Sequence, residues 1–167
     1  MSEGSDPALR EARRTAVLGS VPSDSHHWNL IFLQLLLEEQ GFTVTNLGPC
    51  TPVTDVVQRC LRLRPDLTVI SSVNGHARTE GVALAHALRA LPGRRDAALV
   101  IGGMLTTAQA DSGAAARELL LAGFDAVFIG PDAVDRFLGF LSPSSALTPS
   151  GNPTPWARRS GVLAGAR

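Results

Sequence analysis

Short apolar runs alternate with longer helix-like segments between residues 15 and 141, and this alternation restricts the chain to few folds. The longer segments carry the apolar spacing or the end signals of helices. Strands that alternate with helices are typical of a parallel sheet covered on both faces. The expected strands are residues 16–21, 42–47, 67–72, 98–101 and 126–129, and the expected helices are residues 27–40, 53–63, 79–91, 112–122 and 133–141.

The order of these strands follows from the handedness of their connections. Right-handed crossovers between parallel strands leave few arrangements, and we expect the flavodoxin-like order 2-1-3-4-5. The predicted fold is therefore α/β, a doubly wound five-stranded parallel sheet in one domain over residues 15–141. Residues 1–14 are polar and charged, and residues 142–167 are rich in serine, proline and glycine, so both ends are expected to be flexible.

Two local features add to this prediction. Thr51, which precedes Pro52, is a candidate N-cap for the second helix. The first helix, residues 27–40, carries apolar side chains around much of its circumference. Such a helix is either buried on more than one side or presents a surface to a partner.

Composition excludes several kinds of chemistry, because all 15 basic residues are arginine and the chain has neither lysine nor tyrosine. A Schiff-base lysine, a phosphate-loop lysine, a receiver-domain lysine and a tyrosine acid or base are all absent. The net charge of +0 gives no basic field for nucleic acid, and no apolar run reaches the roughly 18 residues of a membrane helix. We expect a cytoplasmic protein that binds neither nucleic acid nor membrane, with no signal peptide and with Cys50 and Cys60 as free thiols.

Asp24 and His26 follow the first expected strand, at the sheet edge where doubly wound proteins bind ligands. Because one residue separates them, the Asp24 carboxylate can turn back and accept a hydrogen bond from one imidazole nitrogen of His26. The other nitrogen would then be free to bind a metal, with its basicity raised by the carboxylate. The alternative interpretation is a hydrogen-bonded loop histidine without a ligand.

Small residues end the other strands at the same edge. Gly102 and Gly103 end the fourth strand, where bare backbone either lets a bulky cofactor approach or forms a tight turn. Ser71 and Ser72 end the third strand with hydroxyls that suit a nucleotide-like group or local hydrogen bonds. The Gly130-Pro131 pair either lines the same groove or starts the last helix.

These residues resemble the signature of cobalamin-binding domains in mutases and methyl-transfer proteins, which reads Asp-x-His-x-x-Gly, Ser-x-Leu and Gly-Gly. Here the motifs read Asp24-x-His26-x-x-Asn29, Ser71-x-Val73 and Gly102-Gly103, so that Asn29 places a side chain where the signature has glycine. Within this family the chain is most similar to the small subunit of glutamate mutase, also called methylaspartate mutase. The similarity spans residues 15–141 and rests on Val17-Leu18-Gly19, Ser23-Asp24-x-His26, Gly41-Phe42, Asn46-x-Gly48, Asp66-Leu67, Ser71-Ser72, Gly75 and Gly123-Phe124-Asp125.

The resemblance implies a Rossmann-like fold that holds cobalamin with its lower base displaced from cobalt, in a groove between the sheet and the first helix. It implies that His26 becomes the axial ligand of cobalt and that Asp24 orients His26. Ser71 or Ser72 would contact the buried base, and the Gly102-Gly103 pair would admit the nucleotide tail. Further cofactor contacts are implied for Ser25, Asn29, Val73, Gly75, Gly130 and Pro131.

The function implied by the resemblance is that of a subunit in a radical mutase. The chain would present adenosylcobalamin to a separate catalytic barrel subunit, where glutamate rearranges to 3-methylaspartate, and it would be inactive alone. A corrinoid methyl carrier usually has a helical cap domain before the sheet, whereas only 14 residues precede the first strand here. A cobalamin-dependent sensor or regulatory protein stays open as an alternative. A carrier of flavin mononucleotide fits the first loop only loosely.

Overall fold

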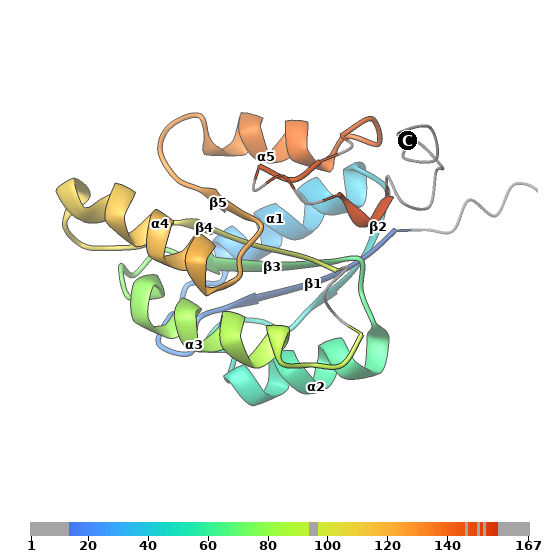
Figure 1. Ribbon diagram of the computed structural model, residues 1–167, viewed down its shortest axis with the longest axis horizontal. Coiled ribbons are helices and arrows are strands. Elements are labelled where there is room, and N and C mark those ends of the chain that lie inside the picture. The colour runs from blue at the N-terminus through green and yellow to red at the C-terminus, as the bar shows by residue number, and fades with distance from the viewer. Residues whose placement is uncertain (1–13, 94–96, 146, 150, 152, 157–167) are drawn as a thin grey trace, which may run out of the picture.

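The computed structural model describes residues 14–93, 97–145, 147–149, 151 and 153–156. Parallel strands form one five-stranded sheet in the order β2-β1-β3-β4-β5, which confirms the predicted doubly wound α/β fold (Figure 1). The strands are β1 (Arg14–Ser20), β2 (Phe42–Asn46), β3 (Leu67–Ser72), β4 (Ala98–Gly103) and β5 (Ala126–Phe128). The helices are α1 (Trp28–Glu39), α2 (Val53–Leu63), α3 (Ala77–Arg89), the short 3₁₀ helix η2 (Gln109–Asp111), α4 (Ser112–Ala122) and α5 (Ala133–Leu141).

Helices cover both faces of this sheet, so the chain has two apolar layers (Figure 1). On one face α1 and α5 pack through Leu30, Leu37, Phe137, Phe140 and Leu141. On the other face α2, α3 and α4 pack through Val56, Cys60, Leu84, Leu88, Ala115 and Leu119. All six residues of β3 are buried, as expected for a central parallel strand. Each large apolar side chain buried in these layers contributes about 1.5–3 kcal/mol.

Part of the C-terminal segment packs against the first of these layers. Trp156 is only 6% exposed, and its ring meets those of Phe42 and Phe140 edge to face at 5.9 and 5.3 Å between centroids. The Arg14 guanidinium lies over the rings of Phe42 and Trp156. This segment belongs to the tail that was expected to be flexible, and the rest of that tail, residues 157–167, and residues 1–13 lie outside the described residues.

The prediction that Thr51 caps α2 is wrong. The helix begins after Pro52, whose backbone is extended, and no side chain caps it. The Thr51 hydroxyl instead donates to the carbonyl of Gly48 at 2.6 Å and accepts the N–H of Ser20 at 3.1 Å. It therefore ties the loop after β2 to the end of β1, next to the sheet edge that concerns function. No described helix is long and apolar enough to cross a membrane.

Candidate functional site

The register of the sheet brings the predicted site residues to one edge. Ser20 of β1 pairs with Ser71 of β3, and Ser71 pairs with Gly102 of β4. The loops that follow these strands therefore start side by side. The carboxyl edge of the sheet is thus the meeting place that the strand pattern predicted.

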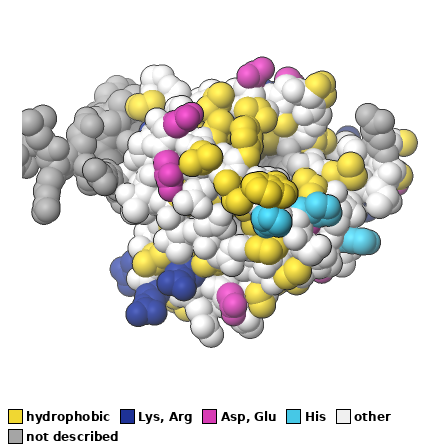
Figure 2. Space-filling view, turned by 180° about the vertical axis from the view of Figure 1, so that it is seen from behind, with side chains coloured by type: hydrophobic (Ala, Val, Ile, Leu, Met, Phe, Trp, Pro, Cys, Tyr) yellow, Lys and Arg dark blue, Asp and Glu magenta, His cyan; other side chains and the backbone are white. Residues whose placement is uncertain are grey.

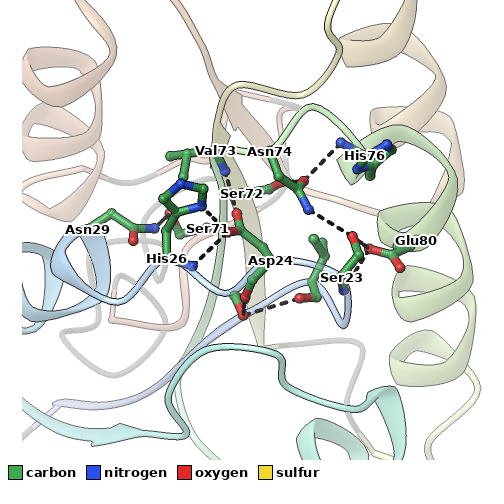
Figure 3. Close-up of polar contacts among 12 residues, drawn as sticks. Ser23, Asp24, His26, Asn29, Ser71, Ser72, Val73, Asn74, His76 and Glu80 are labelled. Carbon is green, nitrogen blue, oxygen red and sulfur yellow. Dashed lines mark hydrogen bonds and ion pairs between the residues drawn. The ribbon is translucent and has the colours of Figure 1, made fainter.

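Asp24 and His26 form a hydrogen-bonded pair in the loop after β1 (Figure 3). His26 Nδ1 lies 2.7 Å from Asp24 Oδ1, which also accepts the backbone N–H of His26 at 3.0 Å. The Asp24 side chain is fully buried, whereas that of His26 is 59% exposed. Because Nδ1 is engaged by the carboxylate, Nε2 is the nitrogen left for a metal.

The buried Asp24 carboxylate is held in its ionised form. Burial by itself raises the pKa of this carboxyl, but hydrogen bonds from the backbone of Val73 and His26 and from the His26 imidazole outweigh that effect. The result is a pKa below the usual aspartate value. The bond from the Val73 N–H to Asp24 Oδ2, at 2.6 Å, also ties the histidine loop to the end of β3.

A second set of polar contacts fixes the other side of this loop (Figure 3). Ser23 donates its hydroxyl to Glu80 on α3 at 2.7 Å and accepts the side-chain amide of Asn74 at 2.9 Å. Asn74 in turn accepts the hydroxyl of Ser72 at 3.1 Å and the backbone N–H of His76 at 3.0 Å. The loop that carries His26 is therefore braced from β3 and α3, which limits its freedom.

An apolar groove of about 210 Å³ lies beside the Asp24–His26 pair, between the sheet and helices α1 and α5. Its lining is almost entirely hydrophobic, with Asn29 and Ser71 as the side chains that carry polar atoms. The lining residues are Asn29, Phe32, Leu33, Val69, Ile70, Ser71, Val73, Val100, Ile101, Gly102, Gly103, Phe128, Ala133, Val134 and Phe137. A flat, mostly apolar group suits such a groove.

Asn29 and Ser71 meet across the groove. The Asn29 side-chain amide, from the first turn of α1, donates to Ser71 Oγ at 2.7 Å. Ser71 lines this groove. Because successive side chains of a strand point to opposite faces of the sheet, Ser72 lies on the other face, where it is fully buried. Of the two serines that were expected to contact the cofactor, the structure places Ser71 in the groove.

The glycines at this edge are required by close backbone approaches. Gly103 has φ +107°, and a Cβ there would lie 2.1 Å from the carbonyl oxygen of Ser72. A Cβ on Gly102 would lie 2.8 Å from the carbonyl oxygen of Phe128. Gly75 has φ +81°, and its Cβ would meet Thr107 at 2.7 Å. Gly102 and Gly103 also line the groove, and their close approaches to neighbouring carbonyls support the tight-turn interpretation.

The remaining predicted residues lie around the groove rather than in its lining. Ser25 is exposed next to His26. Gly130 has φ +88°, and its carbonyl accepts the N–H of Ala133 at 3.2 Å, so the Gly130-Pro131 pair begins α5 and leads into the groove wall.

Comparison with known proteins agrees with this geometry. The profile of the B12 binding domain matches residues 14–135. The chain belongs to the B12-binding domain family. This B12-binding domain is 36% identical over 114 residues to the glutamate mutase sigma subunit of Halobacterium salinarum, covering 68% of this chain and 75% of that protein. The predicted resemblance to small subunits of glutamate mutase is confirmed.

Two further relatives are matched over a smaller share of their own length. The B12-binding domain is 36% identical over 76 residues to the HTH-type transcriptional repressor CarA of Myxococcus xanthus, which is 45% of this chain and 26% of the repressor. Its fold matches that of a cobalamin-binding protein from Desulfitobacterium hafniense with a TM-score of 0.61 and 23% identity, over 78% of this chain and 59% of that one.

The described residues fit a cobalamin bound through a histidine. His26 has a largely exposed side chain whose ring is oriented by a buried carboxylate, and the adjacent groove is apolar and bordered by glycines. The buried Oδ1 of Asn29 has no hydrogen-bond partner among the described residues, which is expected where a bound group completes the contacts.

Sequence reasoning missed the aromatic walls of the groove and the brace of the loop. Phe128 and Phe137 lie on β5 and α5, more than 100 residues after His26, and the sequence pattern placed them only within an expected strand and an expected helix. Glu80 and Asn74 had no motif, and their contact with Ser23 depends on how α3 packs.

Proposed function

We propose that this protein is the cobalamin-binding subunit of a cytoplasmic glutamate mutase. It would hold adenosylcobalamin through His26 and present it to a separate catalytic barrel subunit, which converts glutamate to 3-methylaspartate. The observation that carries the proposal is the Asp24–His26 pair beside an apolar groove at the carboxyl edge of the sheet. The name of the Halobacterium relative, a glutamate mutase sigma subunit, supports the choice of reaction.

The residues of this chain would bind and orient the cofactor. His26 would bind cobalt through Nε2, while Asp24 keeps the proton on Nδ1 and so fixes the tautomer that can act as a ligand. When bound, adenosylcobalamin supplies the radical chemistry, because its cobalt–carbon bond breaks homolytically. Asp24 needs no proton exchange in this role, which agrees with its lowered pKa.

The groove would hold the displaced lower base. Phe128 and Phe137 would supply aromatic surface, and the Ser71 hydroxyl would donate to a ring nitrogen of the base. Gly102 and Gly103 of β4 line the same groove and would border the nucleotide tail.

An exposed apolar stripe on α1 supports the proposed partner. Trp28, Ile31, Phe32 and Leu35 are 41–74% exposed and follow the i, i+3, i+4, i+7 spacing of one helix face. Figure 2 shows hydrophobic side chains beside the histidines on this side of the molecule. Of the residues of α1, only Leu30 and Leu37 are fully buried, so burial on more than one side is not found in the isolated chain. Apolar surface of this kind is typical of an interaction site.

The test is reconstitution. The purified chain should bind adenosylcobalamin and, mixed with a glutamate mutase catalytic subunit, should give 3-methylaspartate from glutamate. Omission of the chain, of the catalytic subunit or of the cofactor should each abolish the product. Cobalamin binding without any product would contradict the proposed reaction while leaving the cofactor assignment intact.

The match to a transcriptional repressor favours a second candidate, a cobalamin-dependent regulatory protein. In that role the same His26 site would bind cobalamin, and the α1 stripe would contact a regulatory partner. The reconstitution assay separates the two candidates, because a regulatory protein would bind the cofactor and support no turnover.

A further inference from the structure

Asn29 carries an unpaired acceptor in the wall of the groove. Its Oδ1 has less than 1 Å² of accessible surface and no hydrogen-bond partner among the described residues, whereas its Nδ2 is satisfied by Ser71 at 2.7 Å (Figure 3). Leaving a buried acceptor unpaired is costly, and such atoms are rare in folded proteins. Because Oδ1 is covered in the free chain, a groove ligand with an N–H donor would reach it only when the Asn29 amide turns, and that contact would remove the cost.

Asn29 and Ser71 together offer both kinds of hydrogen-bonding group. The carbonyl of Asn29 requires a donor, and the hydroxyl of Ser71, which already accepts the Asn29 amide, still has its own proton to donate. Every other side chain in the groove lining is apolar or absent. A base that has an acceptor and a donor therefore pairs with both groups, whereas a base with an acceptor only leaves Asn29 unpaired.

Lower bases of cobamides differ in this respect. Once displaced from cobalt, 5,6-dimethylbenzimidazole, the base of cobalamin, has one free ring nitrogen, which accepts, and no N–H donor. Adenine has ring nitrogens that accept and an exocyclic amine that donates. We propose that this groove selects a cobamide whose lower base carries an N–H donor, such as adenine, over one with dimethylbenzimidazole, and that Asn29 is the specificity-determining residue.

This inference rests on the proposed cofactor site and deepens it. It explains why an amide stands at the position where the family signature has glycine. Asn29 has no left-handed backbone that would need a glycine or asparagine, because Cys50 and Arg64 are the non-glycine residues with positive φ in the described part of the chain. The side chain, rather than the backbone, therefore distinguishes this position.

The experiment measures the dissociation constants of three cobamides with the same corrin ring and upper ligand. Their lower bases are dimethylbenzimidazole, benzimidazole and adenine, so that the second lacks only the methyl groups. Each is titrated calorimetrically into the wild type, Asn29→Gly and Asn29→Ala. The alanine variant keeps helix propensity in the first turn of α1 and guards against a folding defect in the glycine variant. Asn46→Ala is the control, since Asn46 pairs with Gln34 and Gly48 outside the groove.

The quantity that decides is the ratio of adenine-cobamide affinity to dimethylbenzimidazole-cobamide affinity. The cost of detaching each base from cobalt belongs to the free cobamide and cancels when this ratio is compared between proteins. The ratio should fall roughly tenfold or more in both Asn29 variants and stay unchanged in Asn46→Ala. Asn29→Gly should also bind the dimethylbenzimidazole form more tightly than the wild type, while its melting temperature falls.

Three results would overturn the inference. The first result is an equal affinity ratio in the wild type and both Asn29 variants, which would mean that the Asn29 amide does not discriminate between lower bases. The second result is that the wild type binds the benzimidazole form as tightly as the adenine form, when each affinity is expressed relative to that of the Asn29 variants. The groove would then select against methyl groups only. If the wild type binds none of the three cobamides, the proposed cofactor site itself is refuted, and this inference with it.

Discussion

Replacing Asp24 with asparagine tests the role of the buried carboxylate. Asp24 accepts three hydrogen bonds, from the N–H groups of His26 and Val73 and from His26 Nδ1. An asparagine has one acceptor oxygen and one NH₂ group, so in either orientation its NH₂ faces an N–H that the carboxylate would have accepted. Losing one such bond to a charged acceptor costs about 1.5–3 kcal/mol of folding free energy.

The same substitution should weaken cobalamin binding. Without the carboxylate, His26 can carry its proton on Nε2, and that tautomer cannot bind cobalt through Nε2. Removing the partner that orients a metal ligand typically costs roughly 10- to 100-fold in affinity. Calorimetric titration of cobalamin into Asp24→Asn gives this ratio, and a urea unfolding curve gives the loss in stability.

Asp66→Asn is the matched control. Asp66 is also buried and accepts the N–H of Thr15 at 2.8 Å, but it precedes β3 and so lies at the opposite end of the sheet. This variant should lose stability and keep its cobalamin affinity. Equal cobalamin affinity for the wild type and Asp24→Asn would refute the assignment of Asp24 as the orienting group.

Three other predictions concern the architecture around the site. Gly103→Ala should destabilise the fold by more than about 1 kcal/mol, because φ is positive there and the added Cβ would clash with the Ser72 carbonyl. Gly113→Ala, which has open space at its Cβ, should not destabilise the fold, and melting curves of both variants test this. Trp156→Ala should lower the unfolding free energy by about 3–5 kcal/mol in urea titrations and leave cobalamin affinity unchanged, and normal stability would mean that this ring does not pack. Because the pKa of Asp24 is lowered, its ionised form stabilises the fold above the unfolded pKa of about 3.9, and this contribution disappears as the pH falls through the lower folded pKa. The stability difference between wild type and Asp24→Asn should therefore be constant from about pH 7 to pH 5 and shrink below about pH 4, and a constant difference down to pH 2 would contradict the lowered pKa.

The strand pattern predicted the fold well, because the strands of a parallel sheet covered on both faces are buried and therefore have continuous apolar sequences. The site edge followed from the fold, and the contact between Asp24 and His26 followed from their spacing of two residues. The hydrogen bond from Val73 to Asp24 joins residues 49 positions apart, and its donor is a backbone N–H. The side chain at position 73 therefore gives no sequence signal for this bond.

Other features depend on tertiary packing that the sequence pattern does not encode. The burial of Trp156 requires the C-terminal segment to return over Phe42 and Phe140, although its proline- and glycine-rich composition is typical of a flexible tail. The partner for Asn29, Ser71, is 42 residues away, and only the alternation along β3 decides that Ser71 rather than Ser72 faces the groove.

The central claim is that a histidine of this chain, His26, binds cobalt. The most direct measurement is the electron paramagnetic resonance spectrum of the Co(II) form of the complex, with the protein grown on ordinary or on ¹⁵N-labelled histidine. Because the label enters all four histidines, the spectrum is also recorded for His27→Gln, in which the neighbour of His26 is removed. If His26 binds cobalt, labelling should change the nitrogen splitting from three lines to two in both proteins. A splitting that does not respond to the label would show that cobalt is not bound by a histidine. A loss of the response in His27→Gln would show that His27, and not His26, is the ligand.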